Sequence, residues 1–432
     1  MDSHTTKSCL PRLAALCLGI ACLPAWHTAP LRADTAPVET PYAEMDKHAL
    51  NAPKSAEQSI QTLAGYLTAP AKNESQKARA IFCWIAHNIA YDTKSLPVQP
   101  AVRPSADMIL KARTAVCFGY AGLYTELARA AGLEVTEVLG YAKGYGYDVG
   151  DTFGGPPNHA WNAVKMDGQW RLLDCTWGGG HMNEQDQYVR RYDDHYFAAS
   201  PSEFVYDHFP LEPSWQLLEK SISKAEYEQL PNVRPPFFRC RLKLVSHTQA
   251  LIKVRGPFVV TLTSPLDCVV LARLYENGRK LPKSYTFAQK ESDGYKVYAS
   301  FPRAGSYALS IYAKRRGDPE DCEWAMDYIV EAESGLEGAA VYPECFAGFS
   351  EHGARLYSPM YVNPQPGTNA TFKLDVPGAK EVAVVVGKEW HFLPSDQDRF
   401  SGEVPISAEP VQVCARFGET RVFDVLLGYG VK

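Results

Sequence analysis

The chain has 432 residues, of which 46% are hydrophobic and 22% charged, and its formal net charge is −5. This composition is typical of globular proteins, and the length exceeds what one hydrophobic core usually serves, so we expect two or three domains. The mild charge, with no basic patch and no basic stripe interleaved with aromatic residues, argues against nucleic acid as a partner.

Residues 1–33 have the features of a secretory signal peptide. Lys7 and Arg12 supply positive charge, residues 13–23 form an apolar run too short to span a bilayer comfortably, and Ala33 ends a candidate cleavage site. We therefore expect a secreted or periplasmic protein with no stable membrane span after cleavage. Cys22, which follows Gly-Ile-Ala, leaves a lipid-anchored protein as an alternative.

Several helices are predicted in the next segment. Residues 60–67 place apolar side chains at helical spacing until Pro70 ends the pattern, and a second helix, 75–90, carries its apolar residues on one stripe. Ser105 and Asp107 can cap a short helix that leads to the next feature.

Cys117 is predicted to stand at the start of a helix. Apolar residues from 120 to 128 follow the helical period, and Gly132 stops it. The unpaired N–H groups and the positive end of the helix dipole there favour a thiolate, which is the nucleophilic form of cysteine. The alternative is a buried structural cysteine, because cysteine is among the most buried residue types.

His159 and Asp174 are predicted to share one face of a β-hairpin. Residues 159–166 and 169–177 flank Asp167-Gly168, a pair typical of two-residue hairpin turns. With those two residues as the loop, the histidine and the aspartate are diagonal neighbours, roughly 7 Å apart at the backbone. That spacing is within reach of a side-chain hydrogen bond.

The remaining cysteines and histidines are predicted to be structural. Strand alternation puts Cys175 on the face opposite Asp174, in the core. Eight cysteines follow the predicted signal, and reserving Cys117 for chemistry leaves an odd number, so we expect no dense disulfide framework. The chain has no CxxC or HExxH motif, and we expect no metal or cofactor. Three histidines that lack metal-ligand spacing are expected to be surface or packing groups: His181, His195 and His208.

The sequence around these residues resembles the transglutaminase-like superfamily, in particular the branch of the kyphoscoliosis peptidase and its bacterial relatives. The resemblance covers about residues 42–218 and rests on three motifs: Cys117-Phe-Gly-Tyr, Asn158-His-Ala-Trp-Asn and Trp170-Arg-Leu-Leu-Asp-Cys-Thr-Trp-Gly. It implies a papain-like α+β core in which Cys117 is the nucleophile, His159 the general base and Asp174 the group that orients the imidazole.

From about residue 231 the apolar pattern changes to period two, which predicts two all-β modules of the immunoglobulin-like sandwich type. Strands in the first are expected at 238–244, 268–274, 307–314 and 324–330, with turns at 276–278 and 292–294. Strands in the second are expected at 372–376, 382–386 and 411–417, the last with Cys414 on its outward face. The predicted domains are a signal peptide, 1–33, a catalytic domain, 34–220, and β-modules, 231–333 and 336–432.

Three functions fit this sequence. The first is an exported cysteine-nucleophile enzyme, a peptidase or an acyl transferase, that acts on amide bonds of peptides or proteins through Cys117, His159 and Asp174. The second is a catalytically degenerate transglutaminase-like scaffold or binding protein of the cell envelope, whose β-modules hold a partner or an envelope polymer. Phe118 favours it, because the family usually has a polar residue there. The third is a metal-dependent hydrolase in which the same three residues bind a metal.

Overall fold

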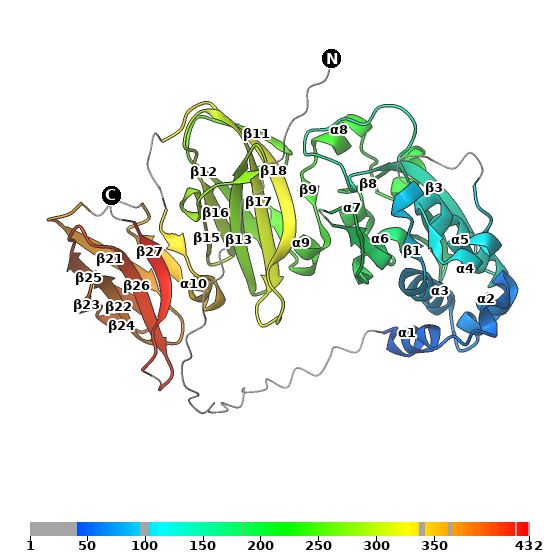
Figure 1. Cartoon of the computed structure of the whole chain (residues 1–432), viewed down its shortest axis with the longest axis horizontal. Coiled ribbons are helices and arrows are strands. Elements are labelled where there is room, and N and C mark those ends of the chain that lie inside the picture. The colour runs from blue at the N-terminus through cyan, green and yellow to red at the C-terminus, as the bar shows by residue number, and fades with distance from the viewer. Residues whose placement is uncertain are drawn as a thin grey trace, which may run out of the picture. The chain divides into compact units, whose positions relative to one another are not determined.

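The computed structural model describes residues 41–95, 103–183, 185–336, 342–361, 365–419 and 421–430 (Figure 1). The predicted signal peptide and the alternative lipid site at Cys22 lie outside these residues. Among the described residues, no helix is both long and apolar enough to cross a membrane. The described apolar side chains form three cores, one in an α+β domain and one in each of two following all-β modules.

The α+β domain begins with helices where the sequence predicts them. Ser59, Asn73 and Ser105 each accept a backbone N–H at a helix start, which satisfies a donor that the first turn leaves unpaired. The helices are α1 (Ala43–Leu50), α2 (Ile60–Thr68), α3 (Glu74–Asn88), α4 (Ala106–Ala112) and α5 (Cys117–Ala130).

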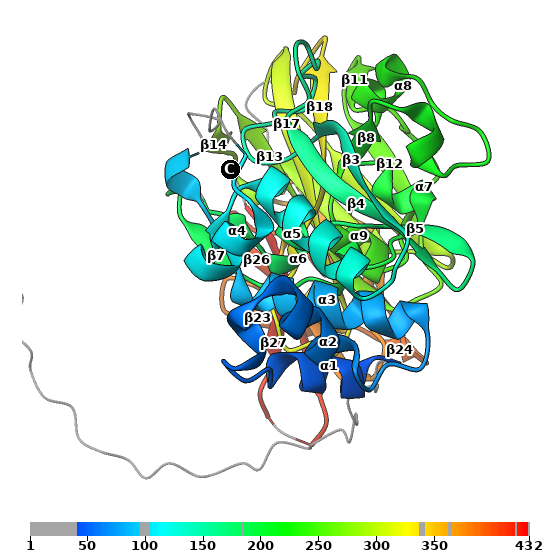
Figure 2. The same ribbon diagram turned by 90° about the vertical axis from the view of Figure 1, so that its right-hand side faces the viewer.

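A four-stranded antiparallel sheet, in the order β5-β4-β3-β8, follows these helices. Helix α5 packs against β4 and β3, as Figure 2 shows. The strands are β3 (Val135–Ala142), β4 (His159–Met166), β5 (Gln169–Leu173) and β8 (His208–Pro210). Smaller elements of this domain are β1 (Ala90–Tyr91), β2 (Thr114–Ala115), α6 (Cys175–Gly179), β6 (Gly180–Met182), β7 (Tyr188–Arg190), α7 (Pro201–Phe204) and α8 (Lys224–Gln229).

The predicted hairpin turn is confirmed, but its second strand is shorter than predicted. Met166 lies opposite Gln169, and the two loop residues, Asp167 and Gly168, have φ values of 51° and 82°, as a type I′ turn requires. Strand β5 ends at Leu173, so the strand predicted to residue 177 is wrong. Residues 175–179 are helical because the preceding aspartate caps them. Cys175 is nevertheless buried in the core, as predicted.

The first β-module holds two sheets around a common core, in the orders β10-β12-β16-β15 and β11-β18-β17-β13-β14. The strands predicted after residue 268 and both turns are confirmed. The strand predicted at 238–244 is confirmed only at its last two residues, which form β10. Its start is wrong, because Pro235 opens helix α9 (Pro235–Arg239), where its fixed φ suits the first turn. The strands are β9 (Asn232–Val233), β10 (Lys243–Leu244), β11 (Leu251–Val254), β12 (Phe258–Thr263), β13 (Cys268–Glu276), β14 (Arg279–Lys280), β15 (Thr286–Lys290), β16 (Gly294–Ala299), β17 (Gly305–Arg315) and β18 (Glu323–Ala332).

The second β-module has the sheets β19-β27-β26-β22-β23 and β20-β21-β25-β24, and its three predicted strands are confirmed. Cys414 is predicted on the outward face of its strand. Val413 and Ala415 on either side of it belong to the module core and Cys414 does not, although its side chain is also buried. The elements are β19 (Glu344–Cys345), α10 (Ala347–Glu351), β20 (Arg355–Ser358), β21 (Asn369–Asp375), β22 (Ala379–Val386), β23 (Glu389–Phe392), β24 (Ser395–Asp396), β25 (Arg399–Pro405), β26 (Val411–Phe417) and β27 (Asp424–Tyr429).

Candidate active site

Cys117 is the first residue of α5, as predicted. The residue before it, Val116, is extended and provides no side-chain cap. The start of this 14-residue helix therefore presents backbone N–H groups and the positive end of the dipole beside the thiol. The cysteine is only 5% exposed. The sulfur therefore lies beside a helix N-terminus with little room around it.

His159 and Asp174 form a buried pair, as the hairpin register predicts. The histidine opens β4 and the aspartate directly follows β5. The imidazole Nε2 lies 2.8 Å from the carboxylate Oδ2, and the two residues are 6% and 1% exposed. The other carboxylate oxygen accepts the backbone N–H of Thr176 at 2.7 Å. The carboxylate therefore fixes one ring nitrogen and leaves Nδ1 of the imidazole for another partner.

The charges of this pair stabilise each other. Burial by itself would lower the pKa of His159, but the carboxylate of Asp174, and after it Cys117, raise that pKa well above its usual range. Burial would likewise raise the pKa of Asp174, but the charge and hydrogen bond of His159 and a hydrogen bond from His208 lower it well below its usual range. The arrangement favours an imidazolium beside a carboxylate, the state that supports a neighbouring thiolate.

Two asparagines of the second motif hold the elements of the site together. Asn162 in β4 donates to the carbonyl of Ala121 at 3.1 Å and to Oγ1 of Thr125 at 3.0 Å, both in α5. Asn158 accepts the N–H of Ala142 at 2.8 Å and donates to the carbonyl of the same residue at 3.1 Å. The strand that carries the histidine is thus tied to the helix that carries the cysteine and to the neighbouring strand β3.

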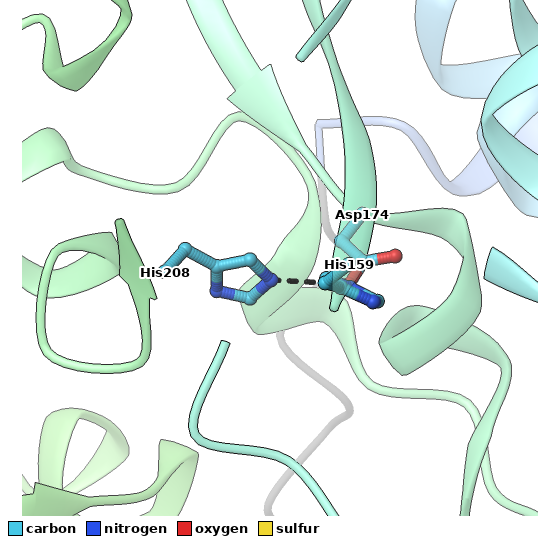
Figure 3. A group of neighbouring side chains, drawn as sticks. All are labelled: His159, Asp174 and His208. Carbon is cyan, nitrogen blue, oxygen red and sulfur yellow. Dashed lines mark hydrogen bonds and ion pairs between the residues drawn. The ribbon is translucent and has the colours of Figure 1, made fainter. Parts of the chain in front are cut away.

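His208 lies beside the His159–Asp174 pair. It is a packing group, as one alternative of the prediction has it, and not a surface group, but it also binds Asp174, which was not predicted. It opens β8, is 1% exposed, and places Nε2 3.2 Å from the same Oδ2 of Asp174 that binds His159 (Figure 3). The sequence offers one signal for it, an Asp-His pair at 207–208 within a run of apolar and aromatic residues. Neither His181 nor His195 has a hydrogen bond to Asp174 among the described contacts.

Aromatic rings surround the two histidines. Trp177 is half-buried, and its ring centroid lies 5.3 Å from that of His159 and 4.5 Å from that of His208. Trp161, fully buried, lies edge-on to His208 at 5.0 Å. These rings keep water from the carboxylate and strengthen the electrostatic interactions inside the site.

The donor atoms of His159, Asp174 and His208 lie within 4.8 Å of one another and could in principle hold a metal ion. Their geometry has a simpler explanation, because both imidazole Nε2 atoms point at one carboxylate oxygen at hydrogen-bond distance. A metal would have to replace both N–H groups, whereas the ligands of a metal site present lone pairs to it. The residues therefore fit a hydrogen-bonded network better than a metal centre.

Two family profiles match the chain. The transglutaminase-like superfamily matches residues 61–175, which include Cys117, His159 and Asp174. The KY-like immunoglobulin-like domain matches residues 224–343, which include the first β-module.

Kyphoscoliosis peptidase is similar to this chain over more than half of the chain's length. The mouse protein, from Mus musculus, is 30% identical over 63% of this chain and 40% of its own length. The human protein, from Homo sapiens, is 31% identical over 61% of this chain and 40% of its own length. A solved structure of a TGase is 18% identical over 40% of each chain with a TM-score of 0.22, a likeness too weak to support an inference. The chain thus spans well under half the length of these two relatives.

Proposed function

Residues 61–175 form a transglutaminase-like core related to that of kyphoscoliosis peptidase, and on this premise we propose that the protein is a cysteine-nucleophile enzyme acting on amide bonds of peptides or proteins. One observation carries the proposal. A buried imidazole and carboxylate, 2.8 Å apart, lie beside a cysteine at the start of a long helix. Thiol, imidazole and carboxylate in this order are the components of a nucleophilic triad.

In the proposed mechanism the Cys117 thiolate attacks the amide carbonyl carbon, forming a C–S bond. The His159 imidazolium gives its proton to the departing amine as the C–N bond breaks, which leaves a thioester. Water or an amine then attacks the thioester carbon, and the imidazole takes a proton from the attacking group. The C–S bond breaks, which releases the carboxylic acid or the new amide and restores the Cys117 thiolate. Asp174 keeps the ring in the required tautomer, and the backbone N–H of Cys117 donates to the oxyanion.

The thiol and the imidazole already interact. The charge of Cys117 and a hydrogen bond between the two side chains both raise the pKa of His159, while Asp174 holds the other side of the ring. Catalytic hydrogen bonds are often long without substrate and tighten in the complex. Whether water or an amine receives the acyl group decides between a peptidase and an acyl transferase, and we favour hydrolysis for an exported protein.

Alkylation of Cys117 tests the proposal. Near pH 6 an ordinary thiol is almost fully protonated, so iodoacetamide should label Cys117 stoichiometrically while the other thiols stay largely unmodified. Cys175, for which burial and the charge of Asp174 raise the pKa, is the matched internal control. Cys117→Ala should abolish both the labelling and any turnover of peptide amides. Titration of Cys117 like a free thiol, near pH 8.5, would contradict the proposal.

A degenerate scaffold is the second candidate, because both reacting groups are nearly covered. Cys117 is 5% and His159 6% exposed, and Phe118 follows the cysteine. In such a protein the thiol would resist alkylation at every pH at which the fold is intact, and the β-modules would hold a partner or an envelope polymer. A metal-dependent hydrolase would differ from both, since EDTA would remove its activity.

Export completes the proposal and rests on the sequence of residues 1–33. The full chain produced in a bacterial host should then accumulate in the periplasm, with its N-terminus at about residue 34. Recovery of intact Met1 in the cytoplasm would contradict export, and attachment of the mature protein through Cys22 to lipid would support the lipid-anchored alternative.

A further inference from the structure

The carboxylate of Asp174 serves two histidines. His159 and His208 donate to the same oxygen, Oδ2, at 2.8 and 3.2 Å. The second ring is held firmly, since it stacks on Phe204 with centroids 4.0 Å apart and contacts Trp177 at 4.5 Å. Its position is therefore set by packing, and the carboxylate has to accommodate both donors.

The far side of the His208 ring faces a second acid. Nδ1 lies 2.6 Å from Oδ1 of Asp207, whose other oxygen accepts the hydroxyl of Tyr196 at 3.1 Å. An ionised carboxylate only accepts hydrogen bonds, so both nitrogens of His208 are satisfied only when both carry hydrogen. The ring then carries a positive charge and lies between two buried carboxylates. Its charge compensates theirs, because a buried carboxylate without a partner of opposite charge is costly.

We propose that His208, supported by Asp207, is a positioning residue that holds the Asp174 carboxylate against His159 and withdraws part of its negative charge. The inference rests on the proposed function and deepens it, because it adds a control on the acid-base group of the same site. A donor on Oδ2 competes with His159 for the same lone pairs. His159 is consequently a weaker base than Asp174 alone would make it, and its imidazolium gives its proton more readily to the departing amine in the first half of the reaction.

Other titratable groups face the network and have to be considered in any pH experiment. Asp174 also acts electrostatically on three groups beside it, Tyr91, Cys175 and Tyr196. Asp207 acts electrostatically on four groups around it: Lys143, His195, Tyr196 and Tyr227. None of these six groups has a described side-chain hydrogen bond to His208. A change at His208 should therefore reach His159 through Asp174 and through the direct contact of the two rings, whose centroids lie 5.3 Å apart.

His208→Phe is the decisive variant, because phenylalanine keeps the aromatic packing and removes both donors. The pKa of His159, followed by NMR of histidine-labelled full-length protein, should rise by about one unit. The alkaline limb of the Cys117 alkylation profile should move to higher pH with it. His208→Gln keeps one donor and should give an intermediate shift. Turnover of a peptide amide should fall about tenfold in His208→Phe, mainly in kcat.

His195→Gln is the matched control, since His195 is also a buried histidine but has no described hydrogen bond to Asp174. It should leave the His159 titration unchanged. A lower melting temperature in His208→Phe with an unchanged His159 titration would show that His208 only packs, and would overturn the inference. If His208→Phe does not fold, an unchanged titration in His208→Gln overturns it equally.

The NMR titration also separates this inference from the proposed function. Should Cys117 titrate as an ordinary thiol while His208→Phe still raises the pKa of His159, the enzyme proposal fails and the coupling of the two histidines stands. Should Cys117 be activated while His208→Phe leaves His159 unchanged, the enzyme proposal stands and the positioning role fails.

Discussion

At the scale of single residues, Asp174 connects the local and the distant parts of the site. One of its oxygens accepts the N–H groups of Thr176 and Trp177 and thereby caps α6, while the other binds two histidines from β4 and β8. A carboxylate with four donors has little freedom to turn. The same side chain therefore ends a strand, begins a helix and orients an imidazole.

Asp174→Asn should separate the orientation of the His159 imidazole from the nucleophilicity of the Cys117 thiol. An amide can present its NH₂ group to the ring and hold the wrong tautomer, and it does not stabilise an imidazolium. We expect peptide turnover to fall by about three to four orders of magnitude. Cys117 should remain modifiable by iodoacetamide, although more slowly. Turnover within about tenfold of the parent would show that Asp174 does not orient His159.

The His159–Asp174 pair should also shape the pH dependence of stability. The folded state raises the pKa of His159, so the contribution of this residue to the free energy of unfolding is complete below about pH 6.5. It is lost as the pH rises through the pKa of His159 in the folded protein. The folded state lowers the pKa of Asp174, so that contribution is complete above about pH 4 and is lost on acidification. Denaturant unfolding from about pH 2 to about pH 10 measures both. His159→Gln should flatten the decline above pH 6.5; an identical slope in parent and variant would contradict this account.

At the scale of elements, the hairpin of β4 and β5 decides whether the histidine and the aspartate meet. A slip of one residue would move every side chain of one strand to the other face. The two turn residues at positive φ prevent that slip, because a type I′ turn fixes which residues pair.

Gly168→Ala should test the turn. An alanine at φ 82° should reduce the free energy of unfolding by about 1 kcal/mol, because a side chain is disfavoured in the left-handed region. Gly65→Ala is the matched control, since Gly65 lies within α2 and an added Cβ meets nothing within 4 Å. That change should raise the free energy of unfolding by about 0.5–1 kcal/mol. Equal effects of the two substitutions in chemical denaturation would contradict a turn held by backbone conformation.

At the scale of the whole molecule, the residue at which the α+β domain ends decides which truncated chains keep the contacts of the site. Helix α8 lies beyond the predicted boundary at residue 220, yet its Tyr227 is fully buried and stacks on Phe153 and Phe209. The Tyr227 hydroxyl also donates to the carbonyl of Asp207 at 3.0 Å. These contacts support the strand that carries His208.

Truncation should therefore depend on where the chain is cut. Residues 34–231 should unfold cooperatively without the β-modules, because they retain α8. Residues 34–220 lose Tyr227 and should be less stable by about 2–3 kcal/mol, the contribution of burying a large aromatic side chain. Thermal unfolding of both truncated chains, with Tyr227→Ala in the full chain as the control, measures the difference. Equal melting temperatures for the two would place the boundary at 220.

The sequence by itself determined the features that depend on short-range chemistry. Helical spacing placed Cys117 at a helix start, Asp167-Gly168 defined the turn, and that register brought His159 to Asp174. The strands predicted from alternating apolar residues were wrong where a helix cap or a proline starts a helix instead, as after Asp174 and at Pro235. Only the tertiary structure decided that His208, 34 residues beyond Asp174, completes the carboxylate's partners. The pairing of β8 with β3 and the aromatic packing place His208 there. Neither produces a periodic pattern in the sequence, because both join segments that are far apart along the chain.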